Sequence, residues 1–218
     1  MILPFLDKTS SFPKTNNALI EPDGLLCCGA DLSVQRLVEA YSKGIFPWYS
    51  DGEPIMWWCP SDRMVLFPNQ LHVSKSLKKH IRQSTPEFFF NRNFSTVINH
   101  CAHIPRQDTG TWITDDMIAA YIDLFNAGRA FCLEVEVDGQ LVGGIYGVKV
   151  AQIYCGESMF SLQSNGSKLA MYGLCQHMLQ NDIKLLDCQI HNPHLETLGA
   201  GLISRNEFNN YLPTKHGF

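Results

Sequence analysis

Two strand-like segments joined by a two-residue turn constrain the fold of this chain more than any other stretch. Residues 131–137 read FCLEVEV, residues 140–148 read QLVGGIYGV, and Asp138-Gly139 lies between them. Asp-Gly readily adopts the positive φ angles of a tight hairpin turn, so the sequence predicts an antiparallel hairpin here. A close approach of another backbone or of a ligand is predicted at three glycines of the second segment, Gly143, Gly144 and Gly147.

The segments around this hairpin alternate between helix and strand patterns. Apolar residues with helical spacing and capping residues predict helices over 74–84, 94–102, 114–125 and 165–180, and a short one from Asn192 to Gly199. Strands are predicted at AQIYC (151–155) and at LLDCQIHN (185–192). Strands paired by a hairpin, followed by a crossover helix and a further strand, indicate the α+β class.

Residues 1–62 differ in composition and pattern from the rest of the sequence. This difference predicts a small N-terminal domain, followed by a second domain over 63–218. The first part is rich in Pro, Gly and turn signals, with one helix that Asp31 or Ser33 caps and Gly44 ends. It also holds the aromatic runs FPWY (46–49) and WW (57–58). These aromatics fit either a small core or a surface on which a nucleic-acid base stacks, and both interpretations stand.

Composition limits the function classes. The net charge of −4 excludes a general basic coat, so a nucleic-acid contact requires a local patch. The sequence has no apolar run of about 20 residues and no secretory signal, so we expect a cytoplasmic protein that does not enter a membrane. The eight cysteines include an adjacent pair but no CxxC spacing, which favours free thiols in a reducing compartment.

A basic patch is predicted on the helix at 74–84. Four cations follow the spacing i, i+3, i+4, i+7 with no acidic residue between them: Lys75, Lys78, Lys79 and Arg82. Such a row is either an ordinary solvated face or a site for nucleic-acid phosphates.

Polar residues inside the apolar stretch 185–192 mark the most promising place for chemistry. If this stretch is a strand, Asp187 and Gln189 share one face about 7 Å apart, where burial is costly unless they bond each other or a ligand. Glu157 poses a similar problem among apolar residues after a predicted strand, with either a structural capping role or a substrate contact.

Other site classes find little support in the sequence. HCAH (100–103) and HNPH (191–194) do not supply the spacing of a zinc site, so we expect no metal. The P-loop and GxGxxG patterns are both missing, and no feature brings a Cys to a His for nucleophilic catalysis.

Long segments of the chain resemble the leucyl/phenylalanyl-tRNA–protein transferase family of the bacterial N-degron pathway. The matching segments are GLLCCGADLSVQRLVEAYSKGIFPWYSDGEPIMWWCP, HVSKSLKK, TWITDDMIAAY, LVGGIYG, GESMF and LLDCQIHNPHLETLGA. The resemblance implies a small N-terminal domain and a GNAT-like acyltransferase domain. It also implies transfer of Leu or Phe, and less well Met, from aminoacyl-tRNA to the N-terminal Lys or Arg of proteins. One departure is Leu162, where the family usually has Arg.

The resemblance also implies roles for individual residues. Asp187 and Gln189 would form the catalytic centre. Lys75, Lys79 and Arg82 would bind the tRNA acceptor stem. The terminal adenosine and the aminoacyl group would contact Tyr41, Trp48, Trp112, Ile145, Tyr154, Glu157, Met159 and Asn192.

An aminoacyl-tRNA is an activated ester, so we expect no ATP, coenzyme A or other cofactor. A glutamine amide is too weak a base to take a full proton. We therefore expect Gln189 to orient the attacking amine, with Asp187 fixing its amide and offsetting positive charge. Glu134 and Glu136 are candidates for recognising the N-terminal Lys or Arg. Two alternatives remain: a GNAT enzyme that uses acyl-CoA, which the missing Gly-rich pyrophosphate turn disfavours, and a non-enzymatic tRNA-binding module.

Overall fold

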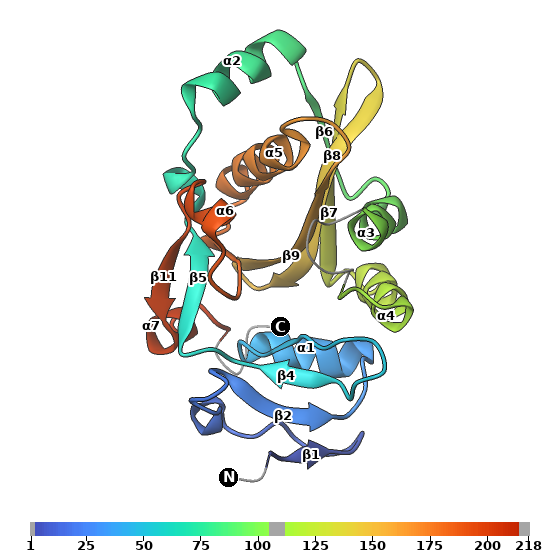
Figure 1. The fold of residues 1–218 in the computed structure, drawn as a ribbon, viewed down its shortest axis with the longest axis vertical. Coiled ribbons are helices and arrows are strands. Elements are labelled where there is room, and N and C mark those ends of the chain that lie inside the picture. Colours follow the sequence, from blue (N-terminus) through green and yellow to red (C-terminus); the bar gives the residue numbers. More distant parts are fainter. Residues whose placement is uncertain (1–2, 105–111, 214–218) are drawn as a thin grey trace.

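The computed structural model describes residues 3–104 and 112–213, which form a small sheet and a large sheet (Figure 1). The small sheet has the order β1-β2-β4-β3, with β1 (Phe5–Leu6) parallel to β2 (Leu25–Gly29) and with β4 (Met56–Trp58) antiparallel to both β2 and β3 (Phe46–Pro47). Helix α1 (Val34–Ser42) lies against this sheet, and the Ser33 hydroxyl caps it by accepting from the Arg36 N–H. Of the two predicted caps, Ser33 is the one used.

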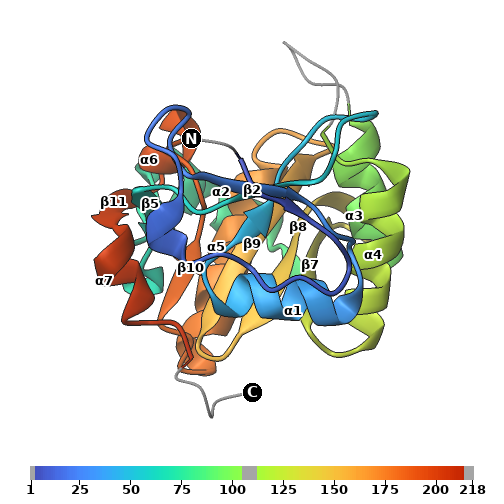
Figure 2. The same cartoon turned by 90° about the horizontal axis from the view of Figure 1, so that it is seen from below.

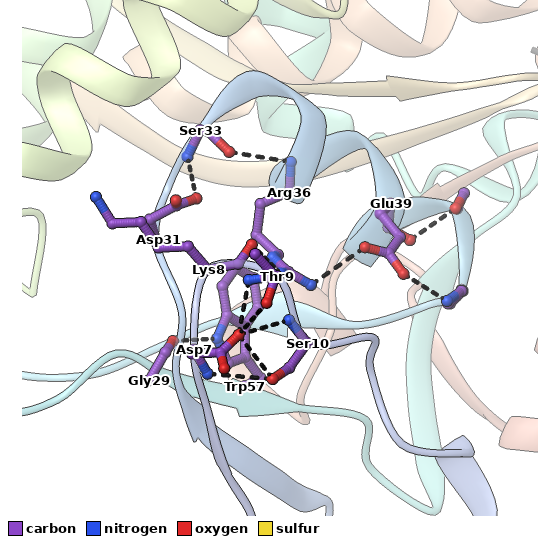
Figure 3. Close-up of polar contacts among 12 residues, drawn as sticks. Asp7, Lys8, Thr9, Ser10, Gly29, Asp31, Ser33, Arg36, Glu39 and Trp57 are labelled. Atoms are coloured by element: carbon purple, nitrogen blue, oxygen red, sulfur yellow. Dashed lines mark hydrogen bonds and ion pairs between the residues drawn. The ribbon is translucent and has the colours of Figure 1, made fainter.

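Buried polar contacts fasten the N-terminal segment to helix α1 (Figure 3). The Arg36 guanidinium is almost fully buried and donates to the Glu39 carboxylate and to the Lys8 carbonyl. Trp57 is fully buried and donates its indole N–H to the Gly29 carbonyl at 2.9 Å. Both buried donors therefore have partners, as burial of polar groups requires.

The large sheet has seven strands in the order β11-β5-β10-β9-β8-β7-β6. Its strands are β5 (Asp62–Leu66), β6 (Glu87–Phe90), β7 (Ala130–Val137), β8 (Gln140–Val150), β9 (Ile153–Ser161), β10 (Leu185–Asp187) and β11 (Gly201–Ser204). Neighbouring strands run antiparallel except β9 and β10, which are parallel. The predicted hairpin is confirmed as β7 and β8. The strand predicted over 185–192 is wrong beyond Asp187, where β10 ends.

Helices cover both faces of the large sheet, which confirms the α+β class. Helices α3 (Phe94–His103) and α4 (Asp115–Asn126) lie on one face, and α5 (Gly166–Gln180) lies on the other (Figure 1). Helix α2 (Lys75–Ser84) follows β5, and the short helices α6 (Pro193–Glu196) and α7 (Arg205–Asn209) flank β11. In Figure 2, which views the molecule from below, α1 lies beside α4 and in front of the large sheet. The predicted helices are therefore present, with ends shifted by a residue or a few.

One apolar core joins the two sheets. It contains Leu37 and Trp57 from the small sheet region together with Tyr121 and Val148 from the large one. A second core fills the space between the large sheet and α5.

The glycines of β8 make the close approach that the sequence predicts. A Cβ on Gly147 would lie 2.0 Å from the Cys155 carbonyl oxygen, and one on Gly143 would lie 2.5 Å from the Gly166 carbonyl carbon. Both neighbours are backbone atoms, so the reason for these glycines is packing rather than a ligand.

No helix within residues 3–104 and 112–213 combines the length and the apolar character needed to cross a membrane.

Candidate functional site

The two parallel strands of the large sheet separate partway along their length. β9 pairs with β10 from Ile153 to Cys155 only, and then continues to Ser161 paired with β8 but without β10. The chain beyond β10 stays with β5 instead, because the Cys188 N–H donates to the Met64 carbonyl and the Met64 N–H donates to the Gln189 carbonyl. The side of β9 that faces β10 therefore has no strand partner from Gly156 onward, and the gap is available to a ligand.

A cavity of about 340 Å³ lies at this gap. Residues from both parts of the fold line it, including Phe46 and Trp48 of the small sheet region and Gly156 to Met159 of β9. Its volume is within the range of sites that hold a small ligand. The residues that the sequence predicts for the site and that line this cavity are Trp48, Trp112, Ile145, Glu157, Met159, Gln189 and Asn192.

Glu157 lines the cavity because β9 contains a bulge. Gly156 pairs with Gly147 and Ser158 pairs with Tyr146, so Glu157 is an extra residue without a partner across the ladder. Bulges change the direction of a side chain and are frequent beside active sites. The sequence places Glu157 after a strand, but the structure places it within one.

Gln189 is held in the left-handed region at φ 61°. Its backbone N–H donates to Asp187 Oδ1 at 2.9 Å, and its side-chain Nε2 donates to Glu157 Oε1 at 3.2 Å. The expectation that Asp187 fixes the Gln189 amide is therefore wrong. Asp187 holds the Gln189 backbone N–H, and Glu157 holds the Gln189 side-chain amide. Because β10 ends at Asp187, the two side chains do not follow the alternation of a regular strand.

Asp187 is fully buried in an ion pair with Arg63. Arg63 Nε and Nη2 donate to the two carboxylate oxygens at 2.8 and 2.7 Å, and Nη1 donates to the Gly44 carbonyl. The guanidinium lies between the rings of Phe46 and Phe208, 4.8 and 4.6 Å from their centroids. Burial by itself would lower the pKa of Arg63, but the Asp187 carboxylate raises it. Asp187 thus stays behind the cavity wall with its charge balanced.

Two buried tyrosines continue the hydrogen-bonded chain away from the cavity. The Tyr121 hydroxyl donates to Glu157 Oε2 at 3.2 Å, and the hydroxyls of Tyr121 and Tyr41 are 2.5 Å apart. Burial raises the pKa of Glu157 from 4.5 to about 7, although hydrogen bonds from both tyrosines oppose the shift. Glu157 therefore titrates near neutral pH, which is common among carboxylates at functional sites.

The raised pKa of Glu157 links folding to pH. The folded protein binds this proton more tightly than the unfolded chain, so the contribution to stability is complete below pH 4.5 and is lost as pH rises to about 7. Glu157→Gln removes this loss, and we expect the stability of the variant to rise by roughly 3 kcal/mol relative to wild type between pH 4.5 and pH 8. Chemical denaturation of both proteins at several pH values measures the gain. Parallel stability curves across that range would contradict it.

Several predicted site residues do not reach the cavity. Tyr41 is buried with its hydroxyl against that of Tyr121, and Asp187 lies in its ion pair. Tyr154 packs on Phe131, with its hydroxyl 3.5 Å from His177 Nε2. These three therefore make no direct lining contact, contrary to the expectation for substrate-binding or catalytic residues.

Glu134 and Glu136, the candidates for recognising the N-terminal Lys or Arg, already bind another side chain. The Arg92 guanidinium donates to both Glu134 and Glu136, and the Asn93 N–H also donates to Glu134. Glu134 is 3% exposed. Arg92 offsets one of the two negative charges and already occupies both carboxylates, so an incoming cation would have to displace it.

The basic helix has the geometry that the sequence predicts. Helix α2 begins after its Ser74 cap, buries Leu77, and leaves Lys75, Lys78, Lys79 and Arg82 exposed. These cations make no ion pair with any described residue. They are free to meet phosphates.

No group of three or more His, Cys, Asp or Glu side chains able to hold a metal occurs within the described part of the chain. The expectation of no metal stays a prediction. All eight cysteines are free, in agreement with the sequence.

Some lining and supporting residues were not predicted. The cavity is also lined by Phe46, Pro47, Met171, Leu186, Cys188, Ile190, His191 and Leu195. Arg63 and Tyr121 support the site from behind. A buried carboxylate at 187 signals that some cation must pair with it, but choosing Arg63 requires knowing that β5 lies beside β10.

Comparison with known proteins gives matches over nearly the whole chain. The family model described as "Leucyl/phenylalanyl-tRNA protein transferase" matches residues 65–213, and the model of its N-terminal domain matches residues 30–61. The leucyl/phenylalanyl-tRNA–protein transferase of Pseudoalteromonas atlantica is 50% identical over 207 residues, which cover 95% of this chain and 88% of the relative. The corresponding protein of Aliivibrio fischeri (strain MJ11) is 49% identical over 206 residues, with 94% and 85% covered.

Solved structures with a similar arrangement include a GCN5-related N-acetyltransferase from Kribbella flavida. Its TM-score is 0.42 at 9% identity, with 74% of this chain and 57% of that chain covered.

Proposed function

The chain belongs to the leucyl/phenylalanyl-tRNA protein transferase family, and from this premise we propose that it moves Leu or Phe, and less well Met, to the N-terminal Lys or Arg of proteins. An aminoacyl-tRNA is the donor and a protein is the acceptor. The proposed consequence is entry of the modified protein into N-degron degradation in the cytoplasm, where aminoacyl-tRNA is available.

The observation that carries this proposal is the Gln189 amide at the wall of an otherwise mostly apolar cavity. Its Nε2 is committed to Glu157, so its oxygen is left to accept a hydrogen bond from an attacking amine. Such positioning of two reactants accounts for about 7–11 kcal/mol of a barrier. No acid–base step by the amide itself is required.

The apolar lining supports selection of Leu and Phe side chains. Met159 and Met171 are unbranched and flexible, which suits flat and γ-branched groups, and the β-branched Ile145 adds a stiffer apolar wall. A methylene contact discriminates by only about 1–3 kcal/mol, so cavity shape has to exclude β-branched residues.

The remaining predicted residues take supporting roles in this proposal. Trp48 and Trp112 offer faces for the terminal adenosine. Asn192 uses its side-chain oxygen to cap α6, which leaves its amide nitrogen for substrate. Residues 1–62 form the domain that supplies Trp48, and residues 63–218 form the GNAT-like catalytic domain.

A transfer assay with purified protein tests the proposal. Labelled Phe-tRNA is mixed with a peptide that bears N-terminal Arg, and with a matched peptide that bears N-terminal Glu. We expect label on the Arg peptide alone and without coenzyme A. Binding of tRNA without transfer would favour the binding module, and activity that appears only with acyl-CoA would favour the other alternative.

The basic face of α2 predicts a salt-dependent interaction with tRNA. If Lys75, Lys79 and Arg82 each meet a phosphate, replacing one with Ala should reduce the slope of log K against log salt by about 0.7–0.9. Titrations of each single variant between 50 and 200 mM salt (about the range in which phosphate contacts are lost) measure this. Lys184→Ala is the control, because its amine is already paired with Asp182. Equal slopes for Lys79→Ala and Lys184→Ala would remove α2 from the interface.

A further inference from the structure

The transfer reaction needs a proton acceptor that the positioning role of Gln189 does not supply. An α-amino group has a pKa of about 7.7–8.0, so most of it is protonated at neutral pH and unable to attack an ester. A Gln amide does not accept a full proton. A group with suitable basicity beside Gln189 would raise the fraction of amine that can attack.

Glu157 is the titratable group in that position. It lines the same cavity as Gln189, and its Oε1 accepts from Gln189 Nε2, so an amine bound at the Gln189 oxygen enters the cavity that the Glu157 carboxylate also lines. We propose that Glu157 takes the proton from the α-ammonium of the acceptor, a step that rests on the transferase function proposed above.

The surrounding groups keep Glu157 able to change charge. It is faced by Tyr41 from α1, Tyr121 from α4, Cys155 on its own strand, Asp187 from β10 and Arg63 from β5. Arg63 is committed to Asp187, so none of these is a free cation that would hold Glu157 permanently ionised. Burial holds the pKa of Glu157 at about 7, close to that of the amine it would deprotonate.

The atoms balance without an added reagent. One N–H bond of the ammonium breaks and an O–H bond forms on Glu157. The neutral amine then attacks the ester carbonyl, the new C–N bond forms, and the bond from that carbonyl to the ribose oxygen breaks. The ribose oxygen leaves with a second proton from the attacking nitrogen, and Glu157 returns its proton to solvent.

The pH dependence of kcat/KM tests this role. For the wild type we expect a rise as Glu157 ionises near pH 7 and a plateau above about pH 8, where the amine is already neutral and no longer needs the acceptor. Glu157→Gln keeps an oxygen for Gln189 but cannot take a proton. At pH 6.5 we expect kcat/KM of the Glu157→Gln variant to be about 10²-fold below that of the wild type. As the fraction of neutral amine rises with pH, kcat/KM of the variant should rise to a plateau that is less than about tenfold below the wild type at pH 9.

A second variant moves the proton acceptor without removing it. Tyr121→Phe deletes a hydrogen bond that lowers the pKa of Glu157, so the acid side of the profile should shift to higher pH. Tyr49→Phe removes a hydroxyl that does not face Glu157 and should leave the profile in place.

A constant ratio of wild-type to Glu157→Gln rates at all pH values would overturn the inference and assign Glu157 to binding or positioning. If that constant ratio came with a raised KM for aminoacyl-tRNA, Glu157 would hold the amino group of the donor instead. A wild type that transfers no label in the first assay would overturn the proposed function itself, whatever the variants do.

Discussion

Replacing Asp187 with Ala is expected to lower the free energy of unfolding by about 3–5 kcal/mol. The change leaves the Arg63 guanidinium without its carboxylate in a site where it is 2% exposed. Since a domain is stable by only about 5–15 kcal/mol, such a loss is large enough to unfold part of the population. Urea denaturation of the wild type and the variant measures the loss, provided that the free energy of unfolding depends on urea concentration with the same slope in both.

Two further variants show whether the loss of stability comes from the buried, unpaired charge. Asp182→Ala removes an exposed carboxylate that also pairs with a cation, Lys184, and should cost no more than about 1 kcal/mol. The double change Arg63→Met, Asp187→Leu removes both charges and should recover most of the stability. If Asp187→Ala were as stable as Asp182→Ala, the ion pair would have little weight in folding.

Replacing Gln189 with Ala is expected to reduce kcat for aminoacyl transfer by about 10²-fold or more. The variant loses the oxygen that orients the amine, while the apolar lining that holds the aminoacyl group is unchanged. The KM for aminoacyl-tRNA should therefore change little. Single-turnover assays with saturating Phe-tRNA separate the chemical step from binding.

The control for this prediction is Gln180→Ala, which removes an exposed amide at the end of α5. Gln189→Asn adds a graded test, because a side chain one methylene shorter no longer reaches Glu157 at the observed 3.2 Å. Near-wild-type kcat for Gln189→Ala, with unchanged KM, would mean that the amide does not position the amine.

Local patterns in the sequence were sufficient to predict most of the secondary structure. The hairpin at Asp138-Gly139 depends on turn chemistry within a few residues, and the caps Ser74 and Thr114 act on N–H groups three residues away. Such signals do not require a knowledge of the fold.

The details of the site depend on contacts between distant parts of the chain. β10 ends at Asp187 because the following residues bond to Met64 on β5 and leave β9. The bulge at Glu157 is set by its pairing with β8. Neither the end of β10 nor the bulge can be read from the apolar alternation of 185–192. The sequence therefore placed Asp187 and Gln189 on one face of a longer, buried strand.

The resemblance to a family supplied the residues of the site but not their contacts. A residue such as Tyr41 belongs to the hydrogen-bonded group around Glu157 without lining the cavity. Distinguishing direct contact from support requires the distances, which only the folded arrangement gives.

The position of β5 in the sheet has a consequence for how the protein is made. Its two strand partners, β10 and β11, both come from the end of the chain, and Arg63 and Asp187 are 124 residues apart. At about 5–20 residues per second, a ribosome needs roughly 6–25 s to supply the missing partner. During that interval β5 has unpaired edges that chaperones could bind, and an incomplete chain has no assembled site. Aminoacyl transfer is therefore expected only from chains in which β10 and β11 have been made.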